Sequence, residues 1–396
     1  MEPYRIAVWI DNYYIPEAGG GYSFLMQLAK KIDEMDFGPE IEIFFVGFDF
    51  KLNFKKKIVN LPFTESYFYR KKVNLYHKLF GGVLQRKDIE RNFLNAQLIL
   101  KNLKIDVIFY PTPGVALKNY PYILVNWDLG HRTTYPFPEL SMDGIWERRE
   151  ADYAKDLGKA IIICAESEAG KNEIIRNYNI LPDKISILPL FPGQIITPKI
   201  KEEKPQWFNQ IKKFFLYPAQ FWPHKNHYNL LLGFKTFLTT NQDYFLILPG
   251  SDKGNINYIK NVIDELQLQK RVILPGFISD ENLKWLYKNS KGLIFPSLLG
   301  PTNMPLLEAL ALGCNVACSN LEGHKNMLGD SAIYFDPLLP TEISEAMEIL
   351  DKKNVTMPLE LALHSPLSVY NIENALASFR SVIEKSKKIR KTWGIQ

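Results

Sequence analysis

The sequence predicts an α/β protein with two doubly wound, parallel-sheet domains that face a cleft. Apolar runs of strand length alternate with segments whose apolar residues recur at helical spacing, and such a series occurs on each side of Phe191–Gln210. That proline-containing stretch has no period, which is typical of an interdomain linker. The chain has 396 residues, of which 46% are hydrophobic, enough for two full-sized cores. We therefore expect domains at residues 1–200 and 201–365, and a C-terminal helix within 366–396 that packs back towards the first domain.

The first series opens with a strand at Arg5–Asp11, three glycines and a helix at Tyr22–Ile32. This order suits a loop that approaches a diphosphate, because glycine lets the backbone of Gly20 and Gly21 come close to it. The expected elements that follow are the strand Glu40–Phe48, the helix Ala96–Leu103, the strands Val107–Tyr110 and Tyr122–Val125, the helix Trp146–Lys159, the strand Ala160–Ala165, the helix Ser167–Asn177 and the strand Lys184–Leu190. Ser167 is a favourable N-cap for its helix.

The second series repeats this alternation after the linker. Its expected strands are Lys213–Tyr217, Tyr244–Leu248, Arg271–Leu274, Gly292–Phe295 and Asn315–Ser319, and its helices are His227–Thr239, Ile256–Leu266, Asp280–Asn289 and Leu306–Gly313. Loops that follow parallel strands lie at one edge of a sheet, where α/β folds bind their ligands. We therefore expect both domains to contribute such loops to one site.

The loop at residues 296–305 carries the strongest signal for a binding site. It leads into a helix, and helix N-termini attract anions, so the amides of Thr302, Asn303 and Met304 are candidates for phosphate binding. Glu308 lies just inside that helix, where its carboxylate can accept hydrogen bonds from hydroxyl groups. An ordinary strand–loop–helix connection has the same pattern and stays the alternative.

Polar side chains also follow the strand Tyr122–Val125. Asp128 and His131 are catalytic candidates, because functional groups gather at the strand ends of parallel sheets. A single histidine is more often structural than catalytic, so both interpretations of His131 stay open.

Charge is unevenly distributed along the chain, whose formal net charge is +5. The segment Lys51–Arg91 alone holds eleven Lys and Arg residues and three acidic ones, mixed with Phe and Tyr. This composition suits an anionic membrane surface, although a solvated helical face has the same pattern. It also suits nucleic acid, but we expect the membrane surface and no nucleic acid as a partner.

Cysteine usage and hydropathy indicate a cytoplasmic protein. Cys164, Cys314 and Cys318 lie in apolar or small-residue runs without metal-ligand spacing, which is typical of reduced core residues. No run of about 18 apolar residues occurs, and the first thirty residues do not resemble a signal peptide. We expect a soluble protein, at most peripheral on the cytosolic face of the membrane.

Eight segments, in their order and spacing, resemble the retaining, nucleotide-sugar-dependent glycosyltransferases of the GT-B fold, a large family that includes many bacterial mannosyl-, glucosyl- and rhamnosyltransferases. The segments are GGGYSFLMQLAKKI, NWDLGHRTTYPFPE, ERREADYAKDL, ESEAGKNEII, YPAQFWPHKNHYNLL, LPGSDKGN, GFISDENLKWLY and PSLLGPTNMPLLEALALGCNVACSNLEG. The resemblance covers nearly the whole chain and implies two Rossmann-like domains facing a cleft.

The resemblance also implies roles for individual residues. Lys225 would neutralise the diphosphate leaving group, with Asp128 and His131 as further catalytic residues, and Glu308 would hold the nucleotide ribose. The other donor-binding residues that it implies are Gly20, Gly21, Gln220, Gly250, Ser251, Thr302, Asn303 and Met304. A retaining transfer of this kind requires no protein nucleophile, and we expect no cofactor and no metal, since the chain contains no Asp-x-Asp.

Two positions near the expected phosphates depart from the family pattern. Gly300 stands where a glutamate often binds the hydroxyls of the donor sugar, and Asn303 can substitute for it as hydrogen-bond donor and acceptor. Gln220 stands in place of an arginine, which leaves Lys225 as the main nearby cation unless His224 is charged.

A third departure lies in the first domain. Trp127 stands where relatives often carry a histidine before the aspartate, so His131 becomes the leading candidate for a histidine in the cleft. These departures bear on the identity of the sugar more than on the type of reaction.

We therefore expect a retaining glycosyltransferase that moves a sugar from GDP-mannose or a UDP- or dTDP-sugar to a saccharide or lipid-linked saccharide in surface polysaccharide synthesis. A non-catalytic, glycosyltransferase-like binding subunit is an alternative that fits the missing glutamate and arginine. A sugar-nucleotide epimerase is another, and it would need paired acid and base groups in place of an acceptor site.

Overall fold

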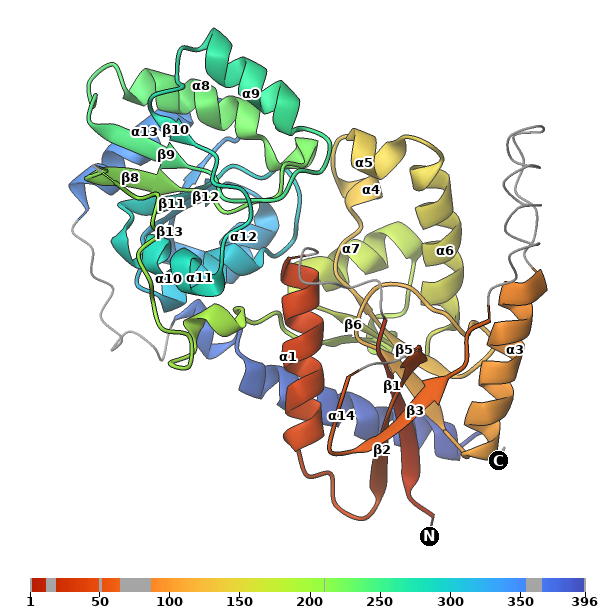
Figure 1. Cartoon of the computed structure of the whole chain (residues 1–396). Helices are drawn as coiled ribbons and strands as arrows, with labels where there is room; N and C mark the ends of the chain where they lie inside the picture. The colour runs from red at the N-terminus through yellow and green to blue at the C-terminus, as the bar shows by residue number, and fades with distance from the viewer. Residues whose placement is uncertain are drawn as a thin grey trace.

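The structure is a computed structural model of the 396-residue chain, and it describes residues 2–11, 19–49, 52–64, 87–209, 211–353 and 365–394. Two parallel β-sheets, each flanked by helices, form two lobes (Figure 1). The first lobe comes from the red-to-yellow half of the chain and the second from the green-to-blue half. The α/β class expected from the sequence is confirmed.

Seven parallel strands form the first sheet, in the order β3-β2-β1-β4-β5-β6-β7. They are β1 Tyr4–Trp9, β2 Ile41–Phe48, β3 Lys57–Leu61, β4 Val107–Tyr110, β5 Tyr122–Asn126, β6 Ile162–Ala165 and β7 Ile185–Ile187. The central strands are almost continuously buried, as helices cover both faces. The edge strand β3 was not predicted, because it lies in the basic segment Lys51–Arg91 and only Leu61 of its residues is buried.

The helices of this lobe are α1 Gly20–Glu34, α3 Lys87–Asn102, α4 Gly130–Thr133, α5 Pro138–Ser141, α6 Ile145–Lys159 and α7 Glu168–Tyr178. Helix α1 buries Phe24, Leu25, Leu28 and Ile32, the apolar positions that predicted it. The predicted cap of α7 is confirmed, since Ser167 Oγ accepts a hydrogen bond from the Gly170 amide at 3.1 Å.

Six parallel strands form the second sheet, in the order β10-β9-β8-β11-β12-β13. They are β8 Lys213–Leu216, β9 Tyr244–Ile247, β10 Val272–Ile273, β11 Gly292–Phe295, β12 Val316–Ser319 and β13 Ala332–Phe335. The helices are α8 His227–Phe237, α9 Ile256–Glu265, α10 Asp280–Asn289, α11 Met304–Ala311, α12 Glu322–Leu328 and α13 Pro340–Lys352. Helix α11 begins at Met304 and not at Leu306 as expected, because Pro305 fits the first turn of a helix.

In both sheets the strand order reverses beside the strand that comes first in the chain. In the first sheet β2 lies on one side of β1 and β4 on the other. In the second sheet β9 lies on one side of β8 and β11 on the other. Ligands of open α/β sheets bind outside the carboxyl ends of the strands at such a switch point. The loops that follow β1, β8 and β11 are therefore where a site is expected.

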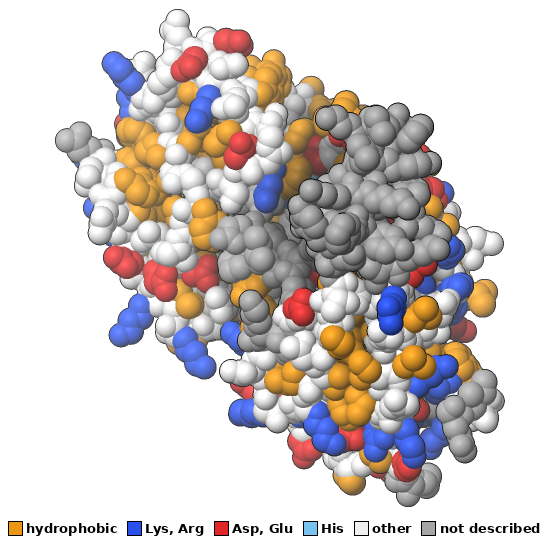
Figure 2. Space-filling view, turned by 45° about the vertical axis from the view of Figure 1, so that its right-hand side comes forward, with side chains coloured by type: hydrophobic (Ala, Val, Ile, Leu, Met, Phe, Trp, Pro, Cys, Tyr) orange, Lys and Arg blue, Asp and Glu red, His pale blue; other side chains and the backbone are white. Residues whose placement is uncertain are grey.

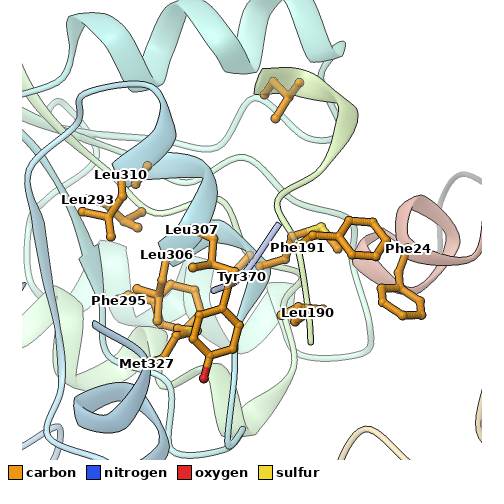
Figure 3. Packing of buried hydrophobic residues seen from close by; sticks show 14 of the residues in the cluster. Phe24, Leu190, Phe191, Leu293, Phe295, Leu306, Leu307, Leu310, Met327 and Tyr370 are labelled. Carbon is orange, nitrogen blue, oxygen red and sulfur yellow. The ribbon is translucent and has the colours of Figure 1, made fainter. Parts of the chain in front are cut away.

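The proline-containing stretch between the sheets is packed and not a solvated tether. Phe191, Ile195 and Phe208 are buried in it. The Phe191 ring stacks on Phe24 of α1 with a centroid distance of 4.8 Å, within the cluster of buried side chains that also holds Leu306 of α11 (Figure 3). The linker thus joins the cores of both lobes.

The C-terminal helix α14, Ile372–Lys391, returns to the first lobe and contacts α1 (blue in Figure 1). The Tyr4 hydroxyl and Ser386 Oγ are 3.0 Å apart, and Lys387 pairs with Glu40 at 2.6 Å. The domain limits at residues 200 and 365 stay a prediction.

Close packing of α8 on α13 leads to a first prediction. A Cβ added to Gly233 of α8 would lie 2.8 Å from the Pro340 carbonyl oxygen and 2.8 Å from Ile343 Cβ. We expect Gly233→Ala to lower the free energy of unfolding by about 1–3 kcal/mol, because the helices must separate. Thermal and urea denaturation of the purified variant measure this.

Gly158→Ala is the matched control, because nothing lies within 4 Å of its added Cβ. It lies in the last turn of α6 and is exposed, so helix propensity predicts an unchanged or slightly higher stability. Equal stabilities of the two variants would contradict the close approach of α8 and α13.

Candidate functional site

The loops at the carboxyl ends of the two sheets meet. A Cβ added to Gly19, whose φ is +72°, would lie 3.5 Å from Gln220 Nε2, and one added to Gly20 would lie 3.9 Å from Met304 Sδ. The glycine loop after β1 therefore faces the loops after β8 and β11 directly. Gly21 is the second residue of α1, one residue further from this contact.

The segment after β5 also contacts the second lobe. A Cβ on Gly130 would lie 2.6 Å from Leu299 Cδ1, and Thr134 Oγ1 donates a hydrogen bond to the Leu298 carbonyl at 2.9 Å. Glu139 Oε1 accepts hydrogen bonds from both the amide of His224, at 3.0 Å, and its Nδ1, at 2.6 Å. Polar and apolar contacts thus hold α4 and α5 against the loops of the second sheet.

Glu308 lies buried on the first turns of α11. Its Oε1 accepts from the Gly193 amide of the linker at 3.2 Å, and its Oε2 accepts from the Tyr287 hydroxyl at 3.2 Å. Burial raises the pKa of Glu308 to about 7, although these two hydrogen bonds oppose the shift. A carboxyl group in this state retains acceptor lone pairs for hydroxyl groups of a ligand.

Lys225 lies in the loop after β8, near the N-terminus of α11. Its Nζ donates to Asn303 Oδ1 at 3.3 Å and lies 5.3 Å from the centroid of the Phe295 ring. Desolvation lowers the pKa of Lys225 to about 8, and the charges of Asp128 and Glu139 across the interface oppose the shift. The site therefore holds a desolvated cation beside a helix N-terminus, which is an arrangement that binds anions.

Asn303 is hydrogen-bonded within the protein. Besides accepting from Lys225, it donates through Nδ2 to the Leu299 carbonyl at 3.3 Å and to His324 Nε2 at 2.9 Å. Both amide hydrogens have acceptors within the protein, and the expected contact of Asn303 with a sugar stays a prediction. Gly300 has a φ of +123°, and a Cβ there would lie 2.5 Å from Asn303 Nδ2, so this loop has no room for the glutamate found in relatives.

His131 does not lie where the sequence suggested. Its side chain has no exposed surface, and Nε2 lies 3.1 Å from the Tyr178 hydroxyl inside the first lobe. Desolvation lowers the pKa of His131, and Tyr153 packs on the ring at 5.3 Å. The expected position in the cleft is therefore wrong, and the structural interpretation of this histidine holds. The histidine beside Lys225 at the interface is His224.

Asp128 stays close to the interface but is already paired. Its Oδ1 accepts from the Gly130 amide at 2.7 Å and from Arg149 Nη2 at 2.8 Å, and 31% of its side chain is exposed. Arg149 was not anticipated, because it lies on α6, 21 residues away in the chain.

The remaining candidates have structural contacts of their own. Gln220 Oε1 accepts from the Trp222 indole at 2.9 Å, and the Ser251 carbonyl accepts from the Phe221 amide at 3.0 Å. A Cβ on Gly250 would lie 2.0 Å from the Ala219 carbonyl oxygen, so only glycine permits this approach of the two strand-end loops. The amide of Thr302 donates to no acceptor in the described part of the chain.

One buried acidic residue, Glu166, and one partly buried one, Glu173, were not expected from the sequence. Burial raises the pKa of Glu166 well above its usual value and that of Glu173 to about 7, and the charge of Asp128 adds to both shifts. Both residues lie in the segment ESEAGKNEII, but nothing in that segment indicates their burial. In the described ranges no three His, Cys, Asp or Glu side chains are grouped to hold a metal ion.

The burial of Glu308 predicts a pH dependence of stability. Its pKa rises from 4.5 to about 7 on folding, so the folded chain binds this proton more tightly than the unfolded chain. The resulting stabilisation is complete below pH 4.5 and is lost as pH rises to about 7. We expect the free energy of unfolding to fall less across this pH window for Glu308→Gln than for the wild type. At pH 8 the free energy of unfolding of the variant should be higher by up to about 3 kcal/mol.

Urea unfolding at several pH values measures this difference. Glu345→Gln, at an exposed position on α13, serves as the control and should follow the wild type. Parallel stability curves for Glu308→Gln and the wild type would show that folding does not raise the pKa of Glu308.

Known proteins resemble this chain in sequence and in fold. Residues 199–359 match the family model "Glycosyl transferases group 1". The chain is 24% identical over 241 residues to the O-antigen chain mannosyltransferase B of Escherichia coli. The aligned region covers 56% of this chain and 62% of that protein. The chain is 25% identical over 169 residues to the O-antigen chain mannosyltransferase RfbU of Salmonella typhimurium, with coverage of 42% and 44%. The chain thus spans less than two thirds of the length of these curated relatives.

Solved structures resemble the chain along its whole length. A glycosyltransferase from Rickettsia africae matches with a TM-score of 0.67 at 14% identity, covering 98% of this chain and 100% of that one. The lipopolysaccharide outer core galactosyltransferase WaaB matches with a TM-score of 0.63 at 15% identity, with coverage of 96% and 99%. At such identities the likeness concerns the fold. The chain therefore has the GT-B fold, and residues 199–359 of its second lobe resemble the glycosyl transferases group 1 family.

Proposed function

We propose that this protein is a retaining glycosyltransferase that moves a sugar from a nucleotide-diphosphate sugar to a saccharide or lipid-linked saccharide, without a metal. One observation carries the proposal. Lys225, Glu308 and the N-terminus of α11 lie in the second lobe, and the glycine loop of the first lobe lies against them. A diphosphate at this position would face a cation, free loop amides and backbone without side chains.

Glu308 would hold the ribose of the donor. Its two oxygens each accept one hydrogen bond from the protein, from Gly193 and Tyr287, and each has a lone pair left. A buried acceptor that is only partly satisfied favours a hydroxyl-bearing ligand, because hydrogen bonds are stronger in a desolvated site.

Lys225 would stabilise the leaving group. In the transfer, the bond between the sugar C1 and the β-phosphate oxygen breaks, and the acceptor oxygen bonds to C1 on the same face. The acceptor proton passes to the departing phosphate. Negative charge grows on the diphosphate, and the nearby ammonium and the positive end of α11 stabilise it by a few kcal/mol each.

The names of the relatives suggest which donor to try first. Both of the O-antigen relatives described above are named mannosyltransferases. We therefore propose GDP-mannose as the first donor, ahead of UDP- and dTDP-sugars, and a role in surface polysaccharide synthesis.

The product of the reaction distinguishes a glycosyltransferase from the two alternative functions. A glycosyltransferase yields a longer saccharide and a free nucleoside diphosphate, whereas an epimerase yields an isomeric nucleotide sugar. A non-catalytic binding subunit yields neither, although it would still bind the nucleotide. Chromatography of a radiolabelled donor after incubation with saccharide acceptors distinguishes the three.

We predict that Lys225→Ala lowers turnover at least about a hundredfold while the protein stays folded, since one leaving-group stabiliser is worth roughly 3–4 kcal/mol. In the wild type, kcat/KM should fall as pH rises through about 8, where Lys225 loses its charge. Lys235→Ala, an exposed position on α8, is the control and should retain full turnover. Near-normal turnover of Lys225→Ala would exclude the assigned role.

We also propose that the protein binds the cytosolic face of an anionic membrane through the segment Lys51–Arg91. Most of that segment, including Lys71 and Lys72, lies outside the described residues, and the face in Figure 2 shows basic and acidic side chains mixed along its lower edge. Within the described residues no helix is long and apolar enough to cross a membrane. Peripheral binding would bring a lipid-linked acceptor to the first lobe.

Liposome sedimentation tests the membrane proposal. The side chain of Lys57 pairs with Glu42 and that of Lys56 donates to the Met35 carbonyl, so these two are left unchanged. We expect Lys55, Lys71 and Lys72 all changed to Glu to abolish sedimentation with anionic vesicles at low salt, because each basic residue contributes about 1 kcal/mol at such a surface. Equal binding of the wild type to neutral and anionic vesicles would contradict the proposal.

A further inference from the structure

We propose that His324 is a positioning residue that sets the orientation of the Asn303 amide and thereby presents its oxygen to Lys225. His324 lies on α12, and 78 residues separate Lys225 from Asn303 in the chain. The inference rests on the proposed function only in its activity readout. It concerns a chain of three hydrogen bonds that ends at the Lys225 ammonium.

The Ser319 carbonyl fixes the tautomer of His324. Its Nδ1 lies 3.0 Å from the Ser319 carbonyl oxygen at the end of β12. A carbonyl can only accept a hydrogen bond, so Nδ1 carries the hydrogen. The ring is fully buried, and desolvation lowers its pKa to about 4, so it is neutral at pH 7 and Nε2 has no hydrogen.

His324 in turn fixes the orientation of the Asn303 amide. Nε2 of His324 is an acceptor, so the group that faces it at 2.9 Å must be the amide nitrogen of Asn303. The other hydrogen of that nitrogen points to the Leu299 carbonyl at 3.3 Å. The amide oxygen is then directed to the opposite side, where Lys225 Nζ lies at 3.3 Å.

The reverse orientation is unfavourable at every contact. It would set the Asn303 oxygen against the bare Nε2 of His324 and against the Leu299 carbonyl, two pairs of acceptors. It would also direct the amide hydrogens at the Lys225 ammonium. In the described part of the chain this ammonium makes its one hydrogen bond to Asn303, so a reversed amide would leave it without a partner.

The packing of α12 keeps His324 at this place. A Cβ added to the preceding residue, Gly323, would lie 2.0 Å from the Pro301 carbonyl oxygen, so α12 touches the backbone of the loop that carries Asn303. Gly300 in the same loop cannot supply a side chain, as its φ of +123° and its distance to Asn303 show. His324 and Asn303 together therefore provide the polar contact to Lys225 that a residue at position 300 does not.

Two amide variants of His324 test the proposal because they differ only in reach. The amide of His324→Asn can still donate to the Ser319 carbonyl, but it is too short to accept from Asn303. His324→Gln places an acceptor near the position of Nε2. We expect His324→Asn to lower kcat about tenfold or more, with little change in the KM of the donor, and His324→Gln to restore most of it.

The pH profile gives a readout that a merely structural role would not change. Without the oriented oxygen the charged form of Lys225 is less stable, so the alkaline limb of kcat/KM should move to lower pH in His324→Asn and return in His324→Gln. Combining His324→Asn with Asn303→Ala should cost no more than Asn303→Ala alone, because the effect passes through Asn303. Additive losses, or an unchanged limb in a folded His324→Asn, would overturn the proposal.

The positioning role of His324 can also be tested if the proposed function is wrong. If the wild type transfers no sugar from any donor, the titration of Lys225 is followed directly by NMR of the protein with isotopically methylated lysines, assigned with Lys225→Arg. A Lys225 pKa that is lower in His324→Asn than in His324→Gln supports the positioning role even then. Equal pKa values in the two variants would exclude it.

Discussion

The hydrogen bond from the Gly193 amide to Glu308 joins the parts of the structure on which the site depends. Gly193 belongs to the linker, and the position of its missing Cβ lies 2.4 Å from Glu308 Oε1 and 3.3 Å from Ser23 Oγ of α1. Only glycine fits between them, so the linker backbone is held between the first helix of one lobe and α11 of the other. The buried carboxyl group is stabilised by this amide, and the lobes are held in register by the same contact.

Desolvation is the physical effect that gives the site its chemistry. The same burial that raises the pKa of Glu308 to about 7 lowers that of Lys225 to about 8. Both groups are thus held near the pH at which they change charge, which is common where a protein binds a charged ligand. A diphosphate would favour the charged form of Lys225, since its attraction replaces the lost solvation.

Substitutions relative to the family pattern are coupled in this structure. Gly300 has a backbone conformation that disfavours side chains, and the space beside it is filled by the Asn303 amide. The amide in turn depends on His324 from a different helix. The absence of a glutamate at position 300 is therefore accompanied by a local hydrogen-bond network. Gly300 departs visibly from the family pattern in the sequence, with Asn303 as its expected substitute, but no local pattern connects them with His324.

The sequence by itself determined the fold class and most of the elements, because periodicity and caps are local properties. Helix α10 at Asp280–Asn289, strand β11 at Gly292–Phe295 and the Ser167 cap were predicted to the residue. It also made Glu308 a candidate from its place just inside a predicted helix, whereas Lys225 became a candidate through the family resemblance. The tertiary structure alone decided which groups meet, since pairs such as Glu139 with His224 are 85 residues apart in the chain. Burial was likewise decided only there, and it placed His131 inside the first lobe, because the aromatic side chains that cover it come from helices that follow it in the chain.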